Sequence, residues 1–156
     1  MKTNNPAEGL TRLNDWGKDF GMQLSDLSKV DATKLVGIAQ EVGVFLVKGR
    51  YSDRRNREGR MNLKMNQIRR FLDAVRRIEA DWKTNKAKSF EEFSDAVVLL
   101  RPKLAYAAGR EEQVIPLVNV LDAAIQSGAA SEKNFMKLLR LIEGIVAYHR
   151  FAGGSN

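Results

Sequence analysis

The chain of 156 residues is long enough for one domain with a single hydrophobic core and too short to predict two. Apolar residues make up 44% and charged residues 29%, a balance that excludes a disordered or membrane chain. The absence of cysteine excludes disulfides and thiolate sites. No apolar run approaches the roughly 20 residues that span a bilayer, and no signal peptide is recognisable, so we expect a cytoplasmic protein without a membrane partner.

The net charge of +7 is concentrated in one part of the chain. Residues 48–77 hold eleven Lys and Arg against three acidic residues, a local charge of +8, so the remainder sums to −1. A basic surface attracts phosphate backbones and anionic lipids at long range. Because solubility alone does not require such a concentration, we predict that this region contacts an anionic partner.

Helical periodicity over almost every segment predicts an all-α protein, a single-domain helical bundle of about five helices with a basic loop between the second and third. Residues 1–30 are expected to form an N-terminal extension with a short helix, weakened by Gly17 and Gly21, and residues 31–154 the helical domain. Asp31 is placed to cap a helix that ends near Lys48. The segment 49–62 has two glycines, five arginines and no periodicity, which predicts an exposed, mobile loop.

The helix expected from Asn66 to about Lys83 has an apolar face and a basic face. Its predicted inward residues are Ile68, Phe71, Leu72, Val75, Ile78 and Trp82. Arg69 and Arg76 are seven residues apart, as are Arg70 and Arg77, so each pair points in nearly the same direction, about 10.5 Å apart along the axis. We therefore expect two rows of arginine that contact phosphate through planar, bidentate guanidinium groups.

The next helix is predicted to begin at a capping box formed by Ser89 and Glu92. Its apolar spacing continues through Pro102, so we expect a kink rather than an end there, and Gly109 is placed to end the helix. Glu111 and Glu112 suit the start of a further helix that runs to about Gln126 and is ended by Gly128. The last predicted helix is capped by Ser131, ends at Phe151 and is followed by Gly153 and Gly154.

The sequence contains little that resembles a catalytic or metal site. The one histidine, His149, lies at the helical angle of Ile142 and Val146, which favours a place in the core or at an interface over a general base. A nuclease that uses His149 with Glu143 is the weakest hypothesis, because the two side chains are about 120° apart around the helix. We expect no enzyme activity, no cofactor and no metal.

Two further sets of residues are candidates for contact with a partner. The loop 49–62 adds arginines beside the basic helix, with Tyr51 available to stack on a base or ribose. Lys103, Tyr106 and Arg110 form a stripe opposite the apolar face of their helix, and Tyr106 is equally compatible with packing against a neighbouring helix.

Four stretches resemble the small helical subunit of type III-A CRISPR effector (Csm) complexes: NQIRRF at 66–71, LLRPKLAYAAGR at 99–110, VIPLVNVLDAAI at 114–125 and FMKLLRLIEGIVAYHRFAGG at 135–154. The resemblance covers about residues 31–154. It implies a non-catalytic all-α subunit, present in several copies beside the guide RNA and its target, with other subunits of the complex as partners. It also favours a fold or interface role for Tyr148, His149, Arg150 and Phe151.

Together, the charge pattern and the resemblance predict RNA contact without sequence specificity, since base pairing with the guide carries the specificity. The predicted RNA-binding residues are Lys48, Arg50, Arg54, Arg55, Arg57, Arg69, Arg70, Arg76, Lys103, Tyr106 and Arg110. The alternative is a free-standing basic helical protein that binds DNA or RNA as a regulator or chaperone. A helix-turn-helix is disfavoured because the long segment 49–62 separates the two helices concerned.

Overall fold

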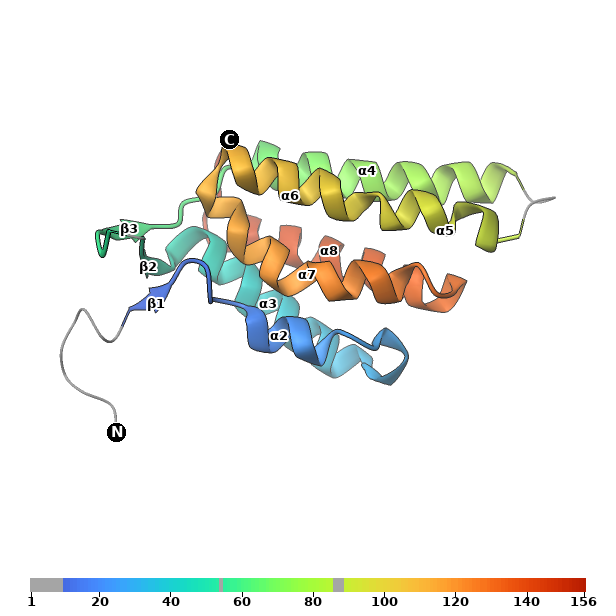
Figure 1. Cartoon of the computed structure of the whole chain (residues 1–156), viewed down its shortest axis with the longest axis horizontal. Coiled ribbons are helices and arrows are strands. Elements are labelled where there is room, and N and C mark those ends of the chain that lie inside the picture. The colour runs from blue at the N-terminus through green and yellow to red at the C-terminus, as the bar shows by residue number, and fades with distance from the viewer. Residues whose placement is uncertain (1–9, 54, 86–88) are drawn as a thin grey trace.

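The computed structural model describes residues 10–53, 55–85 and 89–156. It is an elongated bundle whose long helices run roughly along the same direction (Figure 1). The predicted all-α class is confirmed, with a small sheet of order β1-β2-β3 added at one end. The elements are β1 (Thr11–Arg12), α2 (Lys18–Gln23), η1 (Leu27–Lys29), α3 (Ala32–Lys48), β2 (Arg50–Ser52), β3 (Glu58–Arg60), α4 (Met65–Thr84), α5 (Glu91–Val98), α6 (Leu100–Arg110), η2 (Glu112–Val114), α7 (Ile115–Gly128) and α8 (Glu132–Phe151).

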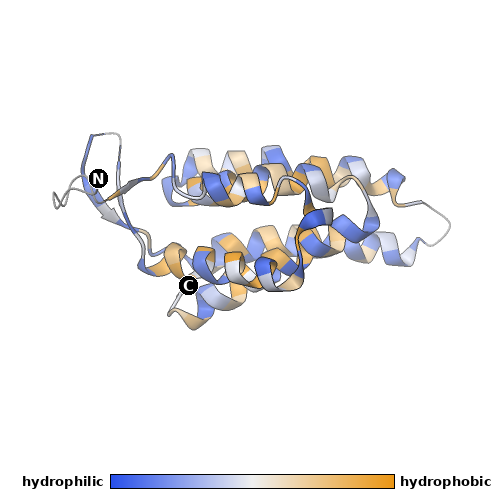
Figure 2. Ribbon diagram, turned by 90° about the horizontal axis from the view of Figure 1, so that it is seen from below, coloured by the Kyte–Doolittle hydropathy of each residue, from blue (hydrophilic) through white to orange (hydrophobic). Residues whose placement is uncertain are grey.

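The hydropathy of the chain differs between the helices and the sheet end of the bundle. Hydrophobic segments recur along the helices, whereas the hairpin at the end of the bundle is mainly hydrophilic (Figure 2). Within the described residues, no helix combines the length and the apolar character of a membrane span.

Two predicted helix starts are confirmed by their side-chain caps. The Asp31 carboxylate accepts the backbone N–H of Lys34 at 2.8 Å, and the Ser131 hydroxyl accepts that of Asn134 at 3.1 Å. Each cap satisfies one of the backbone donors that the first turn of a helix leaves unpaired. The ends predicted near Lys48 and Phe151 are also confirmed, at the ends of α3 and α8.

The centre of the bundle is the contact between α3 and α8. A Cβ at Gly43 would lie 2.7 Å from the carbonyl oxygen of Ile145, so only glycine permits this approach of the two helices. Around this contact, side chains from both helices are fully buried, Val42 and Leu46 on α3 and Leu138 on α8 among them. Burying such a side chain contributes about 1.5–3 kcal/mol to folding, so this contact is a main source of stability.

The helices α4, α5 and α6 form an outer layer on this centre (Figure 1). The predicted basic helix is confirmed as α4, with Ile68, Phe71, Leu72 and Val75 buried. Ile78 and Trp82 are half-buried. The layer therefore presents the arginine rows of α4 on the outside of the bundle.

Pro102 lies inside α6, so the helix does not end there, as predicted, and the interruption lies one turn earlier. The chain forms two helices, α5 and α6, separated at Leu99. Because proline lacks an N–H, the carbonyl group of Val98 loses its usual partner four residues on, and the helix breaks at that turn. The apolar spacing nevertheless continues across the break, since Val97, Leu100 and Leu104 are all buried.

Two other predicted helix ends are wrong. Ser89 does not cap α5, whose first residue follows Phe90 without a side-chain cap, so the capping box with Glu92 does not form. Gly109 does not end α6, which continues to Arg110, and its φ is not positive. The predicted end of α7 at Gly128 is confirmed, and its start is preceded by the single 3-10 turn η2.

The segment 10–30 packs along α3 and α7. Gly17 has a φ of +92°, and a Cβ at Gly21 would collide with the carbonyl oxygen of Asn119 on α7. The Asn119 side chain donates to the carbonyl oxygen of Trp16 at 2.9 Å, and the Trp16 ring stacks on Phe45 with centroids 3.7 Å apart. The glycines that weaken the predicted helix are thus required by its close approach to α7.

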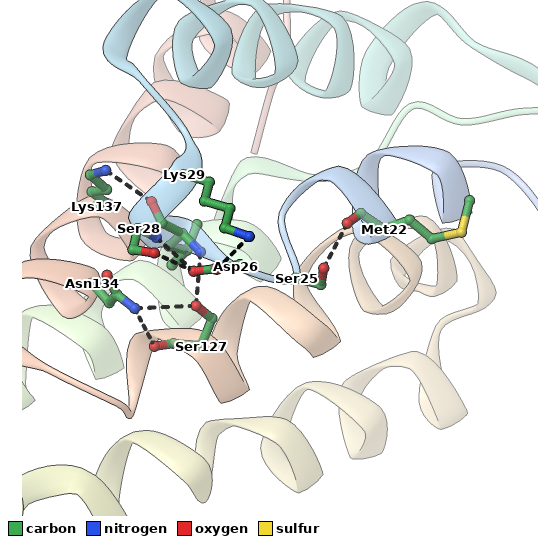
Figure 3. Close-up of polar contacts among 9 residues, drawn as sticks. Met22, Ser25, Asp26, Ser28, Lys29, Ser127, Asn134 and Lys137 are labelled. Carbon is green, nitrogen blue, oxygen red and sulfur yellow. Dashed lines mark hydrogen bonds and ion pairs between the residues drawn. The ribbon is translucent and has the colours of Figure 1, made fainter.

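A polar cluster fastens the second half of this segment to the α7–α8 corner (Figure 3). The Ser127 hydroxyl accepts the N–H of Leu27 at 2.9 Å, and Asn134 donates to the Ser127 carbonyl oxygen at 3.1 Å. Lys137 donates to the carbonyl oxygens of Leu27 and Val30 at 2.9 and 2.8 Å. Because buried polar groups are costly when unpaired, this cluster fixes where the segment lies.

Candidate nucleic-acid interface

The described part of the segment 49–62 forms a β-hairpin instead of the predicted irregular loop, and its described arginines are exposed, as predicted. Strand β2 pairs antiparallel with β3, and β1 adds a parallel strand on the other edge of β2. Tyr51 is only 4% exposed, and its hydroxyl donates to Glu112 at 3.3 Å. Burial, followed by the nearby Glu112 charge, raises the pKa of Tyr51. The prediction that this ring is available to stack on a base is therefore wrong.

Asp53 organises the turn of the hairpin. Its carboxylate accepts the backbone N–H groups of Arg55 and Arg57, each at 2.9 Å, and binds the Arg57 side chain at 2.7 Å. These contacts, with the backbone bond from Arg57 first among them, lower the pKa of Asp53. Asn56 takes the left-handed conformation with φ of 59°, which asparagine tolerates better than most residues. Arg54, another predicted RNA-binding residue, lies outside the described residues.

The arginines of the hairpin are partly neutralised within it. Arg50 pairs with Glu58 at 2.8 Å across the two strands. Lys48 and Arg60 lie beside this pair around a hollow of about 520 Å³. Arg60 was not among the predicted RNA-binding residues, although its strand partner Arg50 was.

The arginine face of α4 carries the expected rows, but its arginines differ in whether they form an ion pair within the chain. Arg69, Arg70 and Arg77 are exposed and make no ion pair with any described residue. Arg76 instead binds Glu143 of α8 at 3.1 Å, and Arg140 binds the same carboxylate at 2.8 Å. Partial burial by itself raises the pKa of Glu143, but the two arginines outweigh it and the pKa is lowered. Arg77, which the prediction placed on this face without assigning it to RNA, is thus less engaged within the chain than Arg76.

A groove opens between β1, the turn of the hairpin and the end of α6. It has a volume of about 910 Å³, and we call it the basic groove. Four arginines line it, Arg12, Arg55, Arg57 and Arg110. The structure therefore brings three predicted residues together and adds Arg12. The sequence gives no local signal for Arg12, because β1 is only two residues long and is defined by its partner strand.

The stripe on α6 faces solvent. Lys103, Tyr106 and Arg110 are all exposed, and Tyr106 is 70% exposed, so it does not pack against a neighbouring helix of this chain. Only Arg110, at the end of the stripe, reaches the basic groove.

His149 is buried and holds the segment that joins the hairpin to α4. Its Nε2 donates to the Leu63 carbonyl oxygen at 2.6 Å, and burial lowers its pKa. Glu143, the partner in the weakest hypothesis, is engaged by Arg76 and Arg140. Among the residues that the structure describes, no group of three or more His, Asp or Glu is arranged to hold a metal ion.

Several of the basic elements meet at one end of the bundle. The start of α4 is tied to the C-terminus by a bond from the Met65 N–H to the Ser155 carbonyl oxygen, and the hairpin and the end of α6 lie at the same end (Figure 1). This end combines the basic groove with the first turns of the α4 face. Such an arrangement suits the binding of a polyanion.

Comparison with known proteins identifies the family. The family model described as Csm2 Type III-A matches residues 29–155. No match was found among curated proteins. The matched range includes both arginine rows, the hairpin and the α6 stripe, and begins after most of the segment 10–30. The chain belongs to the Csm2 family of type III-A CRISPR effector subunits.

Proposed function

We propose that the chain is a non-catalytic RNA-binding structural subunit of a type III-A CRISPR RNA-guided complex that acts in antiviral defence. Membership of the family implies an effector subunit that associates with the other subunits. RNA binding is supported by one observation above all, the exposed row of arginines on α4 that has no carboxylate partner among the described residues. The place of action that follows from this proposal is the cytoplasm.

The proposed contact is electrostatic. Arg69 and Arg70 lie in the first turns of α4, and Arg77 continues the row of Arg70 about 10.5 Å further along the axis. Guanidinium groups bind phosphate oxygens bidentately and release condensed counterions from the RNA. Because these contacts involve the backbone alone, they carry no sequence information, which base pairing between guide and target supplies.

The proposed partners are guide RNA, target RNA, the other subunits of the complex and further copies of this chain. A convex helix face that contacts only a few phosphates contributes little affinity by itself. Repetition along a guide–target duplex raises the total affinity by multivalency. A subunit of this kind lines the body of the complex and holds the RNA in place for its neighbours.

Co-purification with genomic neighbours tests the assembly. The full chain carries an affinity tag and is expressed together with the genes that flank its own. We expect a complex of several subunits and an RNA of guide length to be retained with it. A monodisperse free protein that prefers duplex DNA would instead support the alternative of a free-standing regulator and contradict the proposal.

Binding as a function of salt tests the RNA contact. Replacing Arg69 and Arg70 by Ala should weaken binding to RNA of any sequence and lower the log–log salt slope by up to about two units, because each arginine neutralises about one phosphate. The control replaces Lys34 and Lys133, exposed cations at the starts of α3 and α8, by Ala and removes the same charge. An equal loss in both double variants would contradict a specific contact on α4.

A further inference from the structure

The basic groove has cations that its own carboxylates do not neutralise. Arg12, Arg55 and Arg110 are exposed, come from three separate segments and make no ion pair with any described residue. Arg12 donates a long hydrogen bond of 3.4 Å to the side-chain oxygen of Asn56. Three guanidinium groups around one hollow repel each other unless an anion lies between them.

The carboxylates of the groove are already engaged. Asp53 is held by Arg57 and by two backbone N–H groups of the turn. Asp15 pairs with Lys18 at 3.4 Å. Glu112 accepts the Tyr51 hydroxyl at 3.3 Å, a neutral donor that leaves its charge in place, so the four arginines of the lining outnumber the carboxylates by one. These acidic groups therefore shape the groove and leave its three exposed arginines available to an anionic ligand.

The shape of the groove selects among forms of RNA. Aliphatic side chains contribute to its lining, Leu13, Ala108 and Ile115. Its volume of about 910 Å³ falls within the range of roughly 300–1,000 Å³ typical of small-molecule sites. A nucleotide fits into such a space, whereas a duplex is too wide to enter it and can contact only the rim.

We propose that the basic groove binds an unpaired nucleotide of an RNA strand, with its flanking phosphates on Arg12, Arg55 and Arg110. The unpaired base lies against the aliphatic wall or stacks on a guanidinium plane, as single-stranded RNA does in other proteins. This inference rests on the proposed function for the class of polymer. It adds a second site, distinct from the convex α4 face, that discriminates unpaired from paired RNA.

Gly109 provides a way to block the groove without changing its charge. It lies in the wall of the groove, and a Cβ added there meets nothing within 4 Å, so Gly109→Leu is compatible with folding. Gly37 on α3 has the same open surroundings and does not line the groove, so Gly37→Leu is the matched control. The double variant Arg12→Ala/Arg55→Ala tests the charge separately.

The experiment measures the affinity of the full chain for labelled oligouridine and for an RNA duplex of the same length, at low salt. Gly109→Leu and Arg12→Ala/Arg55→Ala are each expected to weaken oligouridine binding about threefold to tenfold and to leave duplex binding within about twofold. Thermal unfolding of each variant is recorded first. The Arg69→Ala/Arg70→Ala variant should weaken both RNA forms.

Three outcomes would overturn the groove proposal. The first is that the wild-type protein does not bind oligouridine. The second is that Gly109→Leu binds oligouridine as tightly as Gly37→Leu does. The third is that Arg12→Ala/Arg55→Ala loses affinity for the duplex by the same factor as for oligouridine. Failure of the α4 contact is separate and is recognised when Arg69→Ala/Arg70→Ala leaves both RNA forms unchanged. The two arms therefore decide the two sites independently.

Discussion

The two basic regions of this chain, the face of α4 and the β2–β3 hairpin, differ in how many of their arginines form ion pairs within the chain. On α4, Arg69, Arg70 and Arg77 extend into solvent without a carboxylate partner among the described residues. In the hairpin, Arg50 and Arg57 form ion pairs across the strands and within the turn. The charge of a segment therefore overstates the number of cations that remain available to RNA, because a hairpin brings its own acidic residues next to its basic ones.

The largest effect is expected when Tyr51, the buried side chain that holds the hairpin against the core, is replaced. Tyr51→Ala should lower the free energy of unfolding by about 3–5 kcal/mol, because a buried aromatic ring is lost from the core. Tyr51→Phe removes only the hydroxyl bonded to Glu112 and should cost about 1 kcal/mol. Denaturant unfolding followed by circular dichroism measures both. If Tyr51→Ala unfolds at the denaturant concentration of wild type, the hairpin is independent of the core.

The next largest effect is on the pH dependence of stability. The segment that links the hairpin to α4 is held by His149 through the Leu63 carbonyl oxygen. Because burial lowers the pKa of His149 from 6.5, the unfolded chain binds a proton at a higher pH than the folded chain does. This histidine's contribution to stability is therefore complete above about pH 6.5 and decreases as pH falls through the folded pKa.

Urea midpoints between about pH 5 and pH 7 measure this dependence on protonation. His149→Gln keeps a donor to the Leu63 carbonyl oxygen and does not titrate, so it should flatten the pH profile in this window. The carboxylates with lowered pKa, Asp26, Asp53 and Glu143, lose their stabilising contacts at more acid pH. An unchanged profile in the His149→Gln protein would assign the dependence to other groups.

The same contrast explains what could be predicted from the sequence. The α4 rows and the caps at Asp31 and Ser131 depend on residues within a few positions of each other, so periodicity and capping rules locate them. The buried Tyr51 donates its hydroxyl to Glu112, 61 residues away, and no local pattern encodes this contact. The polar composition of 49–62 predicted a loop, whereas β2 and β3 pair with each other inside this segment and β1 pairs with β2 from 40 residues away.

The candidate site divides in the same manner. The α4 arginines were found because one helix carries them, whereas the basic groove is assembled from β1, the turn of the hairpin and the end of α6. Arg12 therefore has no signal in its own neighbourhood. Gly17 and Gly21 were interpreted from the sequence only as residues that weaken a helix. In the structure they are required, because a larger side chain at either position would collide with α7.

A smaller effect distinguishes neighbours within the α4 face. Arg77→Ala should weaken RNA binding about threefold or more, whereas Arg76→Ala should have less effect because Glu143 already engages that guanidinium. Both variants remove one charge from the same helix, so each is the control for the other. Affinity for an RNA duplex at low salt measures the difference. A larger loss in Arg76→Ala would mean that RNA displaces Glu143 from its ion pair.

The smallest effect is expected for Gly109→Ala, which should stabilise the protein, whereas the other substitutions weaken stability or RNA binding. If this glycine ended its helix in the left-handed conformation, as its position in the sequence predicts, Gly109→Ala would be destabilising. In the structure Gly109 lies within α6, its φ is not positive, and an added Cβ meets nothing within 4 Å. Alanine should therefore raise the free energy of unfolding by about 0.5 kcal/mol or more, through the lower backbone entropy of the unfolded chain. Thermal unfolding of the two proteins at equal concentration shows whether the substitution stabilises or destabilises. A lower midpoint for Gly109→Ala would mean that Gly109 ends the helix, as its position in the sequence predicts.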